Sequence, residues 1–542
     1  MHVHCTRGEQ LRERRHFQSL RIIEKPARRG DVTDRNGVIL AMDVPRPSVY
    51  VEPARVEDPE KAAGVLAPVL GVGRGELLKK LRSRSSMEWL ARGVGRDAAA
   101  RVLNADLKCV GVKNEFFRYY PQNRSAAFVV GFKGKDEGLE GVERVYESWL
   151  AGTPERVYLE KDRHGRNVPS SVSRVIPGSE GNRVALTLDM TLQHFAETEL
   201  ESGLEKWRAS QGSVIILEPR TGRVLALASE PGFDPNSDRR YVKNRAISVN
   251  LEPGSTMKAI IAAAAVEAGW NTDTKTFYST GRLKIGPDQV KDAHPETSRH
   301  GWLSISDVIV YSSNVGAAQI GMELGARRVN EILNRFNFGR KLGIGLNGEE
   351  SGIMPSAAEW RRINLATVAF GQGISATPLQ MAAAYAAIAN DGVMMKPSIV
   401  EKIVSPGGEA LYTFAPKRVR RAVSAETARR MKGLLRKVVE EGTGAKAAVE
   451  NYCVAGKTGT AQIPQGGGYS ATDYIASFVG FVPCDEPRVL IQVIIEKPRG
   501  SIYGGEVAAP VFREIAKRTV WRLDVPPADV DRARLVRFQR KP

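Results

Sequence analysis

The sequence contains few cysteines for its length. Only four occur among 542 residues, they are widely separated, and no Cys-x-x-Cys pair is present. This spacing does not match a zinc site, and no motif for an organic cofactor is found, so we expect neither a metal nor a cofactor. The cysteines are Cys5, Cys109, Cys453 and Cys484. Whether Cys453 and Cys484 form a disulfide is left open by the sequence.

Long apolar runs are also missing. No uninterrupted apolar stretch of about 18 residues occurs, which is the length that a membrane-spanning helix needs. The opening segment MHVHCTRGEQLRERRHFQSLRII is too charged for the core of a signal peptide. The hydrophobic and charged fractions, 42% and 26%, are those of ordinary globular proteins. They exclude a disordered chain and an integral membrane bundle.

Acidic residues are the minority among the charged ones. There are 61 Asp and Glu against 79 Lys and Arg, which leaves a formal net charge of +18. Such an excess suits a polyanionic partner, such as nucleic acid, anionic lipid or a cell-wall polymer. The basic residues are spread along the chain and form no recognisable nucleic-acid-binding pattern. We therefore expect a solvated basic surface and no nucleic-acid partner.

The chain is longer than a single hydrophobic core usually serves, which predicts two or three domains. A basic, helical lead containing Leu11, Phe17 and Leu20 is expected first. The segment RRGDVTDRNGVILAMDVPRPSVYVEP then predicts strands joined by a turn at Asn36-Gly37. A Gly-, Pro- and Ser-rich stretch predicts a domain junction near residues 180–195. The expected parts are a lead (1–24), a mixed, β-containing pedestal domain (25–185), a large domain (186–520) and a tail (521–542).

The second half has strand signals at both ends and helix signals between them. GSVIILEP and RVLALAS flank a tight turn and predict a hairpin, and YIASFVGFVP and RVLIQVIIEKP predict further core strands. MKAIIAAAAVEAGW, LSISDVIVYSSNVGAAQIGMELG and TPLQMAAAYAAIANDG are typical of helices. This order predicts an α+β fold, an α/β sandwich in which helices flank an antiparallel sheet.

The first candidate for chemistry is the segment EPGSTMKAIIAAAA, which carries Ser255 and Lys258. Pro and Gly followed by an Ala-rich run place Ser255 at the start of a helix. Residues three apart share a helix face, so the lysine amine can draw a proton from the hydroxyl. The helix start also offers free N–H groups to a developing oxyanion. Ser-x-x-Lys alone is weak evidence and is better explained by a helix cap and a solvated lysine.

The second candidate is VIVYSSNVGAAQIG, where a polar trio ending in Asn314 interrupts an apolar sequence. Buried polar groups are costly without partners. The Ser312 hydroxyl and the Asn314 amide could relay a proton and hold both a lysine amine and a substrate peptide group. A loop or a helix cap explains the same residues.

The third candidate is YCVAGKTGTAQI, which is strand-like and carries Lys457, Thr458, Gly459 and Thr460. Gly459 allows a close backbone approach, and a peptide substrate could pair with the strand as an added strand. Lys457 and the two threonine hydroxyls would bind a substrate carboxylate. A phosphate-binding loop is excluded, because Asn451 stands where its first glycine is required. A simple strand-end turn is the alternative.

The order Ser-x-x-Lys, Ser-x-Asn, Lys-Thr-Gly is the active-site set of serine penicillin-recognising enzymes. Further matching segments are RRGDVTDRNGVILA, GLEGVERVYESWLAG, FGQGISATPLQ and YGGEVAAPVF. Over nearly its whole length the chain resembles a class B penicillin-binding protein of the FtsI or SpoVD type. The resemblance implies a pedestal (penicillin-binding protein dimerisation) domain followed by a transpeptidase domain of the penicillin-binding/β-lactamase fold.

The resemblance also implies a cellular location, partners and substrates. The expected place is the outer face of the bacterial cytoplasmic membrane, and the expected partners are an FtsW-type glycan polymerase and other divisome proteins. Members of the family begin with a membrane anchor just upstream of the region corresponding to Arg7–Gly30. This chain starts where that anchor should end. We expect an anchor lost by truncation or by a misassigned start. The expected substrates are D-alanyl-D-alanine stem peptides of peptidoglycan, with β-lactams as inhibitors.

The expected mechanism assigns one role to each candidate residue. Lys258, kept neutral by burial and by the Lys457 cation, deprotonates Ser255, and the N–H groups of Ser255 and Thr460 form the oxyanion hole. Ser312 passes a proton to the leaving amine, and Asn314 orients Lys258 and the substrate. Hydrolysis by a D,D-carboxypeptidase or serine β-lactamase, and a non-catalytic division scaffold, are the alternatives. No dedicated deacylating base is identified from the sequence.

Overall fold

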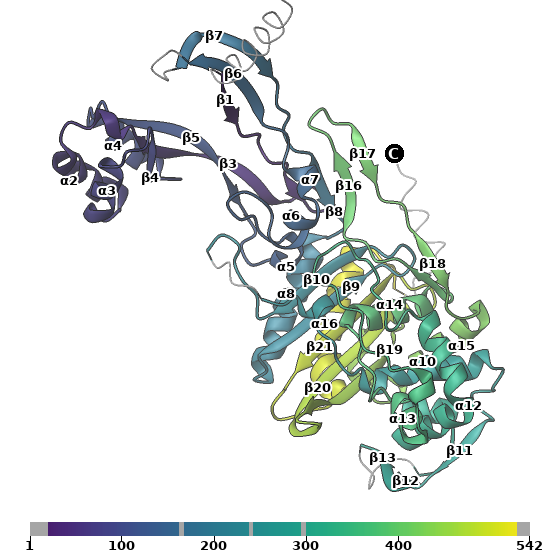
Figure 1. Cartoon of the computed structure of the whole chain (residues 1–542). Helices are drawn as coiled ribbons and strands as arrows, with labels where there is room; N and C mark the ends of the chain where they lie inside the picture. The colour runs from purple at the N-terminus through teal and green to yellow at the C-terminus, as the bar shows by residue number, and fades with distance from the viewer. Residues whose placement is uncertain (1–19, 162–166, 238–241, 294–299, 528–542) are drawn as a thin grey trace, which may run out of the picture.

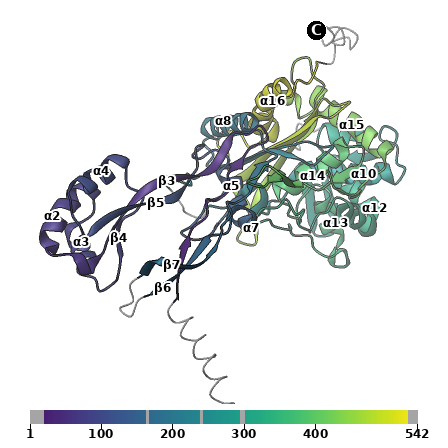
Figure 2. The ribbon, with the colours of Figure 1, turned by 90° about the horizontal axis from the view of Figure 1, so that it is seen from above.

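The computed structural model describes residues 20–161, 167–237, 242–293 and 300–527. Figures 1 and 2 show a slender first part, coloured purple to blue, that projects from a broad second part coloured teal to yellow. Helices and strands are mixed in both parts. The predicted α+β class is therefore confirmed.

A small helical head lies at the tip of a two-stranded arm in the first part (Figure 1). Its first helix begins after Asp58, whose side chain accepts a hydrogen bond from the Lys61 N–H, and ends at Gly71 in the left-handed conformation, φ 63°. The head has its own core, which includes Leu66 and Leu77. The arm and head comprise β3 (Ile39–Val51), α2 (Pro59–Leu70), α3 (Arg74–Leu81), β4 (Glu88–Ala91), α4 (Arg96–Asn104) and β5 (Val110–Tyr119).

A separate three-stranded sheet lies beside the arm, in the order β1-β6-β7. Leu20, which the sequence placed in a helical lead, begins a strand instead, because it pairs with Glu160, 140 residues further along the chain. Leu11 and Phe17 lie outside the described residues. Short helices precede this sheet. These elements are α5 (Ala127–Val130), α6 (Gly141–Val145), α7 (Glu147–Leu150), β1 (Leu20–Lys25), β6 (Glu155–Lys161) and β7 (Asn167–Ile176).

A buried ion-pair network holds the base of the first part together. The Glu143 carboxylate, fully buried, accepts from Arg29 Nε and from Arg118 Nε, each at 2.6 Å. Arg29 also pairs with Glu147 at 2.7 Å, and its backbone N–H donates to Asp43 at 2.8 Å. Buried charges persist only when they are paired in this way. The network ties the start of the chain to the arm and to the helices before β6.

One sheet contains strands from both halves of the sequence. Its order is β17-β16-β8-β2-β3-β4, with β5 paired to β3. β2 and β3 are joined by the predicted turn, in which the Asp34 carboxylate accepts from the N–H groups of Asn36 and Val38, both at 2.8 Å. β8 pairs with β2 on one side and with β16, more than 200 residues later, on the other. The additional strands are β2 (Val32–Thr33), β8 (Arg183–Leu186), β16 (Val400–Val404) and β17 (Ala410–Thr413).

The sheet of the broad part is antiparallel and five-stranded, in the order β10-β9-β21-β20-β19. The predicted hairpin forms β9 and β10, and the two later strand signals form β20 and β21. β21 is buried on both faces, with Val493 in one hydrophobic core and Leu490 in the other. The strands are β9 (Gln211–Leu217), β10 (Val224–Glu230), β19 (Ala455–Gln465), β20 (Gly468–Val482) and β21 (Val489–Glu496).

Helices cover both faces of this sheet. The core on one face includes residues of α8 and α16, and the core on the other includes residues of α10, α14 and α15. α16 continues to Arg522 and Val525 is buried, so packing extends past the expected start of the tail at 521. The main helices are α8 (Met190–Lys206), α10 (Met257–Glu267), α11 (Ile305–Val310), α12 (Asn314–Arg335), α13 (Arg362–Val368), α14 (Pro378–Ala389), α15 (Ala425–Glu440) and α16 (Gly504–Arg522).

Short elements complete the broad part. Two hairpin-like ribbons lie between α10 and α11, and a third two-stranded sheet follows α14. Among the described helices, none combines the length and the apolar composition that a membrane crossing requires. The short elements are α9 (Arg245–Ser248), β11 (Thr276–Ser279), β12 (Arg282–Ile285), β13 (Asp288–Lys291), β14 (Gly301–Ser304), β15 (Val393–Met395) and β18 (Arg418–Arg421).

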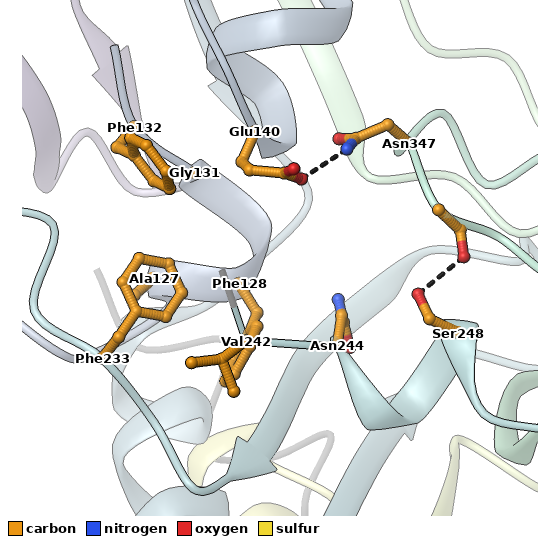
Figure 3. Close-up of a pocket in the computed structure, with 11 residues that line it drawn as sticks. Ala127, Phe128, Gly131, Phe132, Glu140, Phe233, Val242, Asn244, Ser248 and Asn347 are labelled. Atoms are coloured by element: carbon orange, nitrogen blue, oxygen red, sulfur yellow. Dashed lines mark hydrogen bonds between the residues drawn. The ribbon is translucent and has the colours of Figure 1, made fainter. Parts of the chain in front are cut away.

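The two parts also meet through side chains around a cavity of about 30 Å³ (Figure 3). Phe128 and Phe132 pack edge-on against Phe233, with ring centroids 5.2 and 5.9 Å apart. On the opposite wall Asn347 donates to Glu140. The first part is therefore joined to the second by aromatic packing and hydrogen bonds as well as by the shared sheet.

Candidate active site

Ser255 lies in a single 3₁₀ turn, Gly254–Thr256, that leads directly into α10. The turn is held from behind, because the Gly254 N–H donates to Gly371 at 3.1 Å and Tyr385 Oη donates to the Thr256 carbonyl at 2.7 Å. Ser255 is partly exposed and lines a cleft of about 840 Å³. Its hydroxyl has no hydrogen-bond partner among the described residues, so it is free to face a ligand in the cleft.

Lys258 lies one turn further along α10 and is buried, with 1% of its surface exposed. Its Nζ donates to the Ser312 carbonyl at 2.6 Å, to Asn314 Oδ1 at 2.7 Å and to Ser312 Oγ at 3.2 Å. Burial lowers the pKa of Lys258 to about 7, while the nearby Asp292 carboxylate acts in the opposite direction. At neutral pH this amine is therefore poised between its charged and neutral forms.

The middle segment lies between α11 and α12. Ser312 has a left-handed backbone, φ 62°, which is rare outside glycine and is found at strained functional positions. Ser313 caps α12 by accepting from the Gly316 N–H at 3.0 Å. This conformation turns both the carbonyl and the hydroxyl of Ser312 towards Lys258. It also explains why α11 and α12 are separate helices and do not continue as one.

Lys457 approaches the same serine from β19. Its Nζ donates to Ser312 Oγ at 3.0 Å and to the Thr458 carbonyl and hydroxyl, each at 3.2 Å. Lys457 is fully buried, and burial together with the neighbouring Lys258 lowers its pKa well below the usual value. Burial is the largest cause that lowers the pKa of Lys258. The repulsion between the two buried amines is reciprocal, so it disfavours a state in which both carry a charge.

Lys457 does not line the cleft, whereas Thr458 and Thr460 do. Both threonines belong to β19, which is the edge strand of the five-stranded sheet, so one backbone edge of β19 is unpaired within that sheet. A Cβ atom on Gly459 would lie 2.2 Å from Ser477 Oγ and 3.0 Å from Thr256 Cγ2. Gly459 therefore allows β19 to pack closely against the Ser255 turn, as the sequence predicted.

The structure thus brings together residues that lie about 200 positions apart in the sequence. Ser255, Ser312, Asn314, Thr458 and Thr460 all line one cleft, and Lys258 and Lys457 lie directly behind Ser312. Chemically, this arrangement offers a hydroxyl nucleophile, a buried amine near neutrality and an open strand edge for an extended peptide.

Two cleft residues were missed by sequence reasoning. Asp292, at the end of β13, is 4% exposed and accepts from Ser313 Oγ and from the N–H groups of Asn314 and Val315. Thr443, after α15, shares a 2.7 Å hydrogen bond with the Thr458 hydroxyl. A single aspartate after a short strand carries no sequence signal of its own. Thr443 lies in the segment VVEEGTGAKA, for which no role was predicted.

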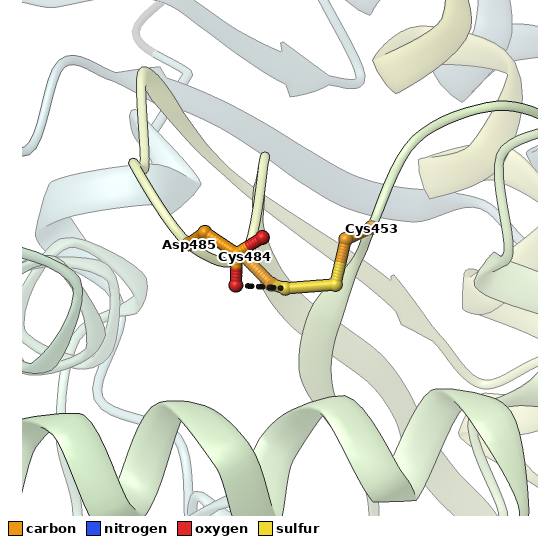
Figure 4. A group of neighbouring side chains, drawn as sticks. All are labelled: Cys453, Cys484 and Asp485. Atoms are coloured by element: carbon orange, nitrogen blue, oxygen red, sulfur yellow. Dashed lines mark hydrogen bonds between the residues drawn. A yellow bond between two sulfur atoms is a disulfide. The ribbon is translucent and has the colours of Figure 1, made fainter. Parts of the chain in front are cut away.

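The pairing of Cys453 with Cys484, which the sequence left open, is resolved by the structure. The two residues form a disulfide with a Cα–Cα distance of 5.2 Å (Figure 4). Asp485 lies beside them, but the sulfurs are bonded to each other and are not available as thiolate ligands for a metal. Cys453 precedes β19 and Cys484 follows β20, so the disulfide fastens the start of the Lys457 strand to its neighbour.

Comparison with known families agrees with this architecture. Residues 212–517 match the penicillin binding protein transpeptidase domain, and residues 24–186 match the penicillin-binding protein dimerisation domain. A sheet flanked by helices, preceded by a mixed domain, is the organisation that these two families combine. The chain belongs to the penicillin-binding protein transpeptidase family.

Individual relatives cover nearly the whole chain. Stage V sporulation protein D of Bacillus subtilis (strain 168) is 34% identical over 511 residues, which cover 92% of this chain and 79% of the relative. Peptidoglycan D,D-transpeptidase FtsI of Escherichia coli (strain K12) is 31% identical over 527 residues, covering 94% and 86%. The crystal structure of penicillin-binding protein 3 from Mycobacterium tuberculosis, complexed with aztreonam, has a TM-score of 0.72 at 29% identity and covers 93% of this chain and 98% of that chain.

We predict that removing the disulfide destabilises the broad part without altering the Ser255 turn. The bridge closes a loop with a sequence separation of 31, for which loss of chain entropy gives about 3 to 4 kcal/mol. The double variant Cys453→Ser/Cys484→Ser is expected to melt several degrees below the wild type in a thermal unfolding experiment. Cys109→Ser, which removes a buried free thiol, serves as the control. A reductant should lower the melting temperature of the wild type and of the control but not that of the double variant; equal responses would contradict the prediction.

Proposed function

We propose that this protein is a peptidoglycan D,D-transpeptidase that works through an acyl-enzyme on Ser255. The observation that carries the proposal is the meeting of three distant segments at one point. Lys258 and Lys457 both donate to Ser312 Oγ, and Asn314 accepts from Lys258. Ser255, whose hydroxyl has no partner in the part of the chain that the structure describes, lines the same cleft as Ser312 and Asn314. The names of the relatives, which include two peptidoglycan D,D-transpeptidases, support the same activity.

In the first step Lys258, in its neutral form, takes the proton of Ser255, and Ser255 Oγ attacks the carbonyl carbon of the penultimate D-Ala. The N–H groups of Ser255 and Thr460 stabilise the oxyanion, each contributing about 3 to 4 kcal/mol to the transition state. Ser312 gives its proton to the amine of the terminal D-Ala as the peptide bond breaks, and it takes the proton that Lys258 removed from Ser255, so Lys258 is neutral again. The hydrogen bonds between Ser312 and both lysines support this relay.

The donor peptide is proposed to pair with the open edge of β19, with its terminal carboxylate at Thr458 and Thr460. Lys457 contributes from behind, through its hydrogen bonds to Ser312 and Thr458, and Gly459 keeps the strand close to the Ser255 turn. An amine of a neighbouring stem peptide then attacks the acyl-enzyme. The new peptide bond is a cross-link, and Ser255 regains its proton.

Hydrolysis of the acyl-enzyme is less well supported. Two carboxylates line the described part of the cleft, Asp292 and Glu506. Asp292 already accepts hydrogen bonds from Ser313, Asn314 and Val315, and Glu506 is paired with Lys446. Neither is placed as a base for a deacylating water, which favours transfer to an amine over a carboxypeptidase or β-lactamase reaction.

We predict that Ser255→Ala abolishes covalent labelling by a fluorescent penicillin, because the other hydroxyl of this turn, that of Thr256, is buried and donates to the Pro253 carbonyl at 2.7 Å. Labelled protein is measured on a denaturing gel, with Ser405→Ala, in a distant surface turn, as the control. The wild type and the control should label equally and keep the label for hours, as a transpeptidase does. Equal labelling of Ser255→Ala would refute the nucleophile, and rapid loss of the wild-type label would favour a hydrolase or β-lactamase. Growth restored by Ser255→Ala in a complementation assay would favour the scaffold.

We predict that acylation slows on the acid side of neutrality. The reaction needs Lys258 neutral, and its pKa of about 7 means that each pH unit below this value removes about nine-tenths of the reactive form. The second-order rate constant for penicillin labelling, measured from pH 5 to 9, should fall about tenfold per unit below the midpoint and level off above it. Lys258→Arg, which stays protonated throughout, should label at no pH in this range. A flat profile would contradict the role of Lys258.

The pedestal domain is proposed to dock onto an FtsW-type glycan polymerase and other divisome proteins in septal wall synthesis. We assign it residues 25–185, with the lead at 1–24, the transpeptidase domain at 186–520 and the tail at 521–542. The disulfide supports a location outside the cytoplasm, because disulfides persist in oxidising compartments. We propose the outer face of the cytoplasmic membrane, with an anchor upstream of the lead.

We predict that the sheet next to the lead takes part in this docking. Ile22 and Val175 on that sheet are half exposed, at 51% and 50%. Ile22→Glu should reduce co-purification of the polymerase with the full chain from solubilised membranes, because it places a charge in an apolar contact. Trp521→Glu, a similar change at an exposed residue of α16, is the control. Both variants should retain penicillin labelling; equal co-purification of the two would contradict the assignment.

A further inference from the structure

The Asp292 carboxylate contacts the segment between α11 and α12 and accepts hydrogen bonds from three consecutive residues. It accepts from Ser313 Oγ at 3.1 and 3.2 Å, from the Asn314 N–H at 2.5 Å and from the Val315 N–H at 3.0 Å. Its own N–H donates to the Gly281 carbonyl at 3.0 Å. A carboxylate that is 4% exposed and bound on both its side chain and its backbone is rigidly placed.

The donors of Asp292 form the first turn of α12. Those N–H groups have no partner within the helix, and a negative charge at that end is favoured by the helix dipole. Ser312 immediately precedes this turn and is held in its left-handed conformation between α11 and the bound turn. Loss of the carboxylate would release the turn and with it the carbonyl and hydroxyl that receive Lys258.

Asp292 also acts on the Lys258 amine through its charge. The two groups are linked by Asn314, whose N–H donates to Asp292 at 2.5 Å and whose Oδ1 accepts from Lys258 Nζ at 2.7 Å. A carboxylate at this place favours the protonated form of the Lys258 amine, whereas the buried Lys457 opposes a second charge. The other ionisable side chains that line the cleft are Lys291, Tyr311, Tyr474, Tyr503 and Glu506.

We propose that Asp292 is a positioning residue for acylation, which holds the Ser312–Asn314 segment in register and sets the proton occupancy of the Lys258 amine by its negative charge. The inference rests on the proposed acylation of Ser255. It gives Asp292 two separable effects. Hydrogen bonding controls geometry and therefore the maximum rate, whereas charge controls the pH at which Lys258 becomes a base.

The test measures the second-order rate constant for labelling of Ser255 by a fluorescent penicillin from pH 5 to 9 in full-length variants. Asp292→Asn keeps an oxygen that can accept from Asn314 and Val315 but removes the charge. Its midpoint should move to lower pH by about one unit, because the protonated amine loses its stabilising neighbour. Asp288→Asn, the same change at an exposed residue of β13, the strand that precedes Asp292, should leave the midpoint unchanged.

Asp292→Glu keeps the charge and displaces the carboxylate by one methylene, so it should keep the wild-type midpoint with a lower maximum rate. Asp292→Ala removes both functions, so its rate on the alkaline plateau should fall by about 100-fold and its midpoint should move to lower pH like that of Asp292→Asn. Thermal melting of each variant separates these effects from unfolding, and the Glu variant tests the proposal if the Asn variant does not fold. Equal midpoints in the wild type and Asp292→Asn, or a shifted midpoint in Asp292→Glu, would overturn the role of the charge. Absence of Ser255 labelling in the wild type would instead refute the proposed function, and with it this inference.

Discussion

Two lysine amines donate to one serine hydroxyl in the interior of this protein, and much of the surrounding structure serves to make that contact possible. An isolated buried ammonium is very costly, so each amine needs fixed acceptors and a shared counter-charge. The acceptors are Ser312 and Asn314 for Lys258, and Ser312 and Thr458 for Lys457. In water a lysine amine is protonated at neutral pH. Burial lowers the pKa of Lys258 to about 7, so this amine can act as a base near neutral pH.

The contact depends on elements that are remote from each other in the chain. α10 presents Lys258, the α11–α12 loop presents Ser312, and β19 presents Lys457. β19 is held by β20, by the disulfide at its start and by the N-terminus of α16, where the Gly504 N–H donates to Thr460 Oγ1 at 3.2 Å. At its other end α16 meets the first part of the chain, since Arg522 pairs with Asp189, which also accepts from Asn36. The cleft and the arm thus share a continuous scaffold.

Local sequence signals predicted the elements that are determined locally. The hairpin of β9 and β10, the turn at Asn36-Gly37 and the serine at the start of α10 follow from turn chemistry and periodicity. Long-range pairing was not predictable in this way. Leu20 became a strand residue because of β6, and Asp292 gained its position from a helix that begins 22 residues later. The depth at which Lys258 and Lys457 are buried, which lowers both of their pKa values, likewise follows only from the packing around them.

The open edge of β19 has a cost that is separate from catalysis. An unpaired strand edge is a template for any extended chain, and soluble proteins usually cover or blunt such edges to avoid self-association. Here the edge strand borders a recessed cleft, next to the Ser255 turn and the start of α16. The Ser255 turn and the start of α16 restrict the approach to this edge, which limits pairing with the edge of another sheet. The same walls that orient a substrate therefore act as protection against aggregation.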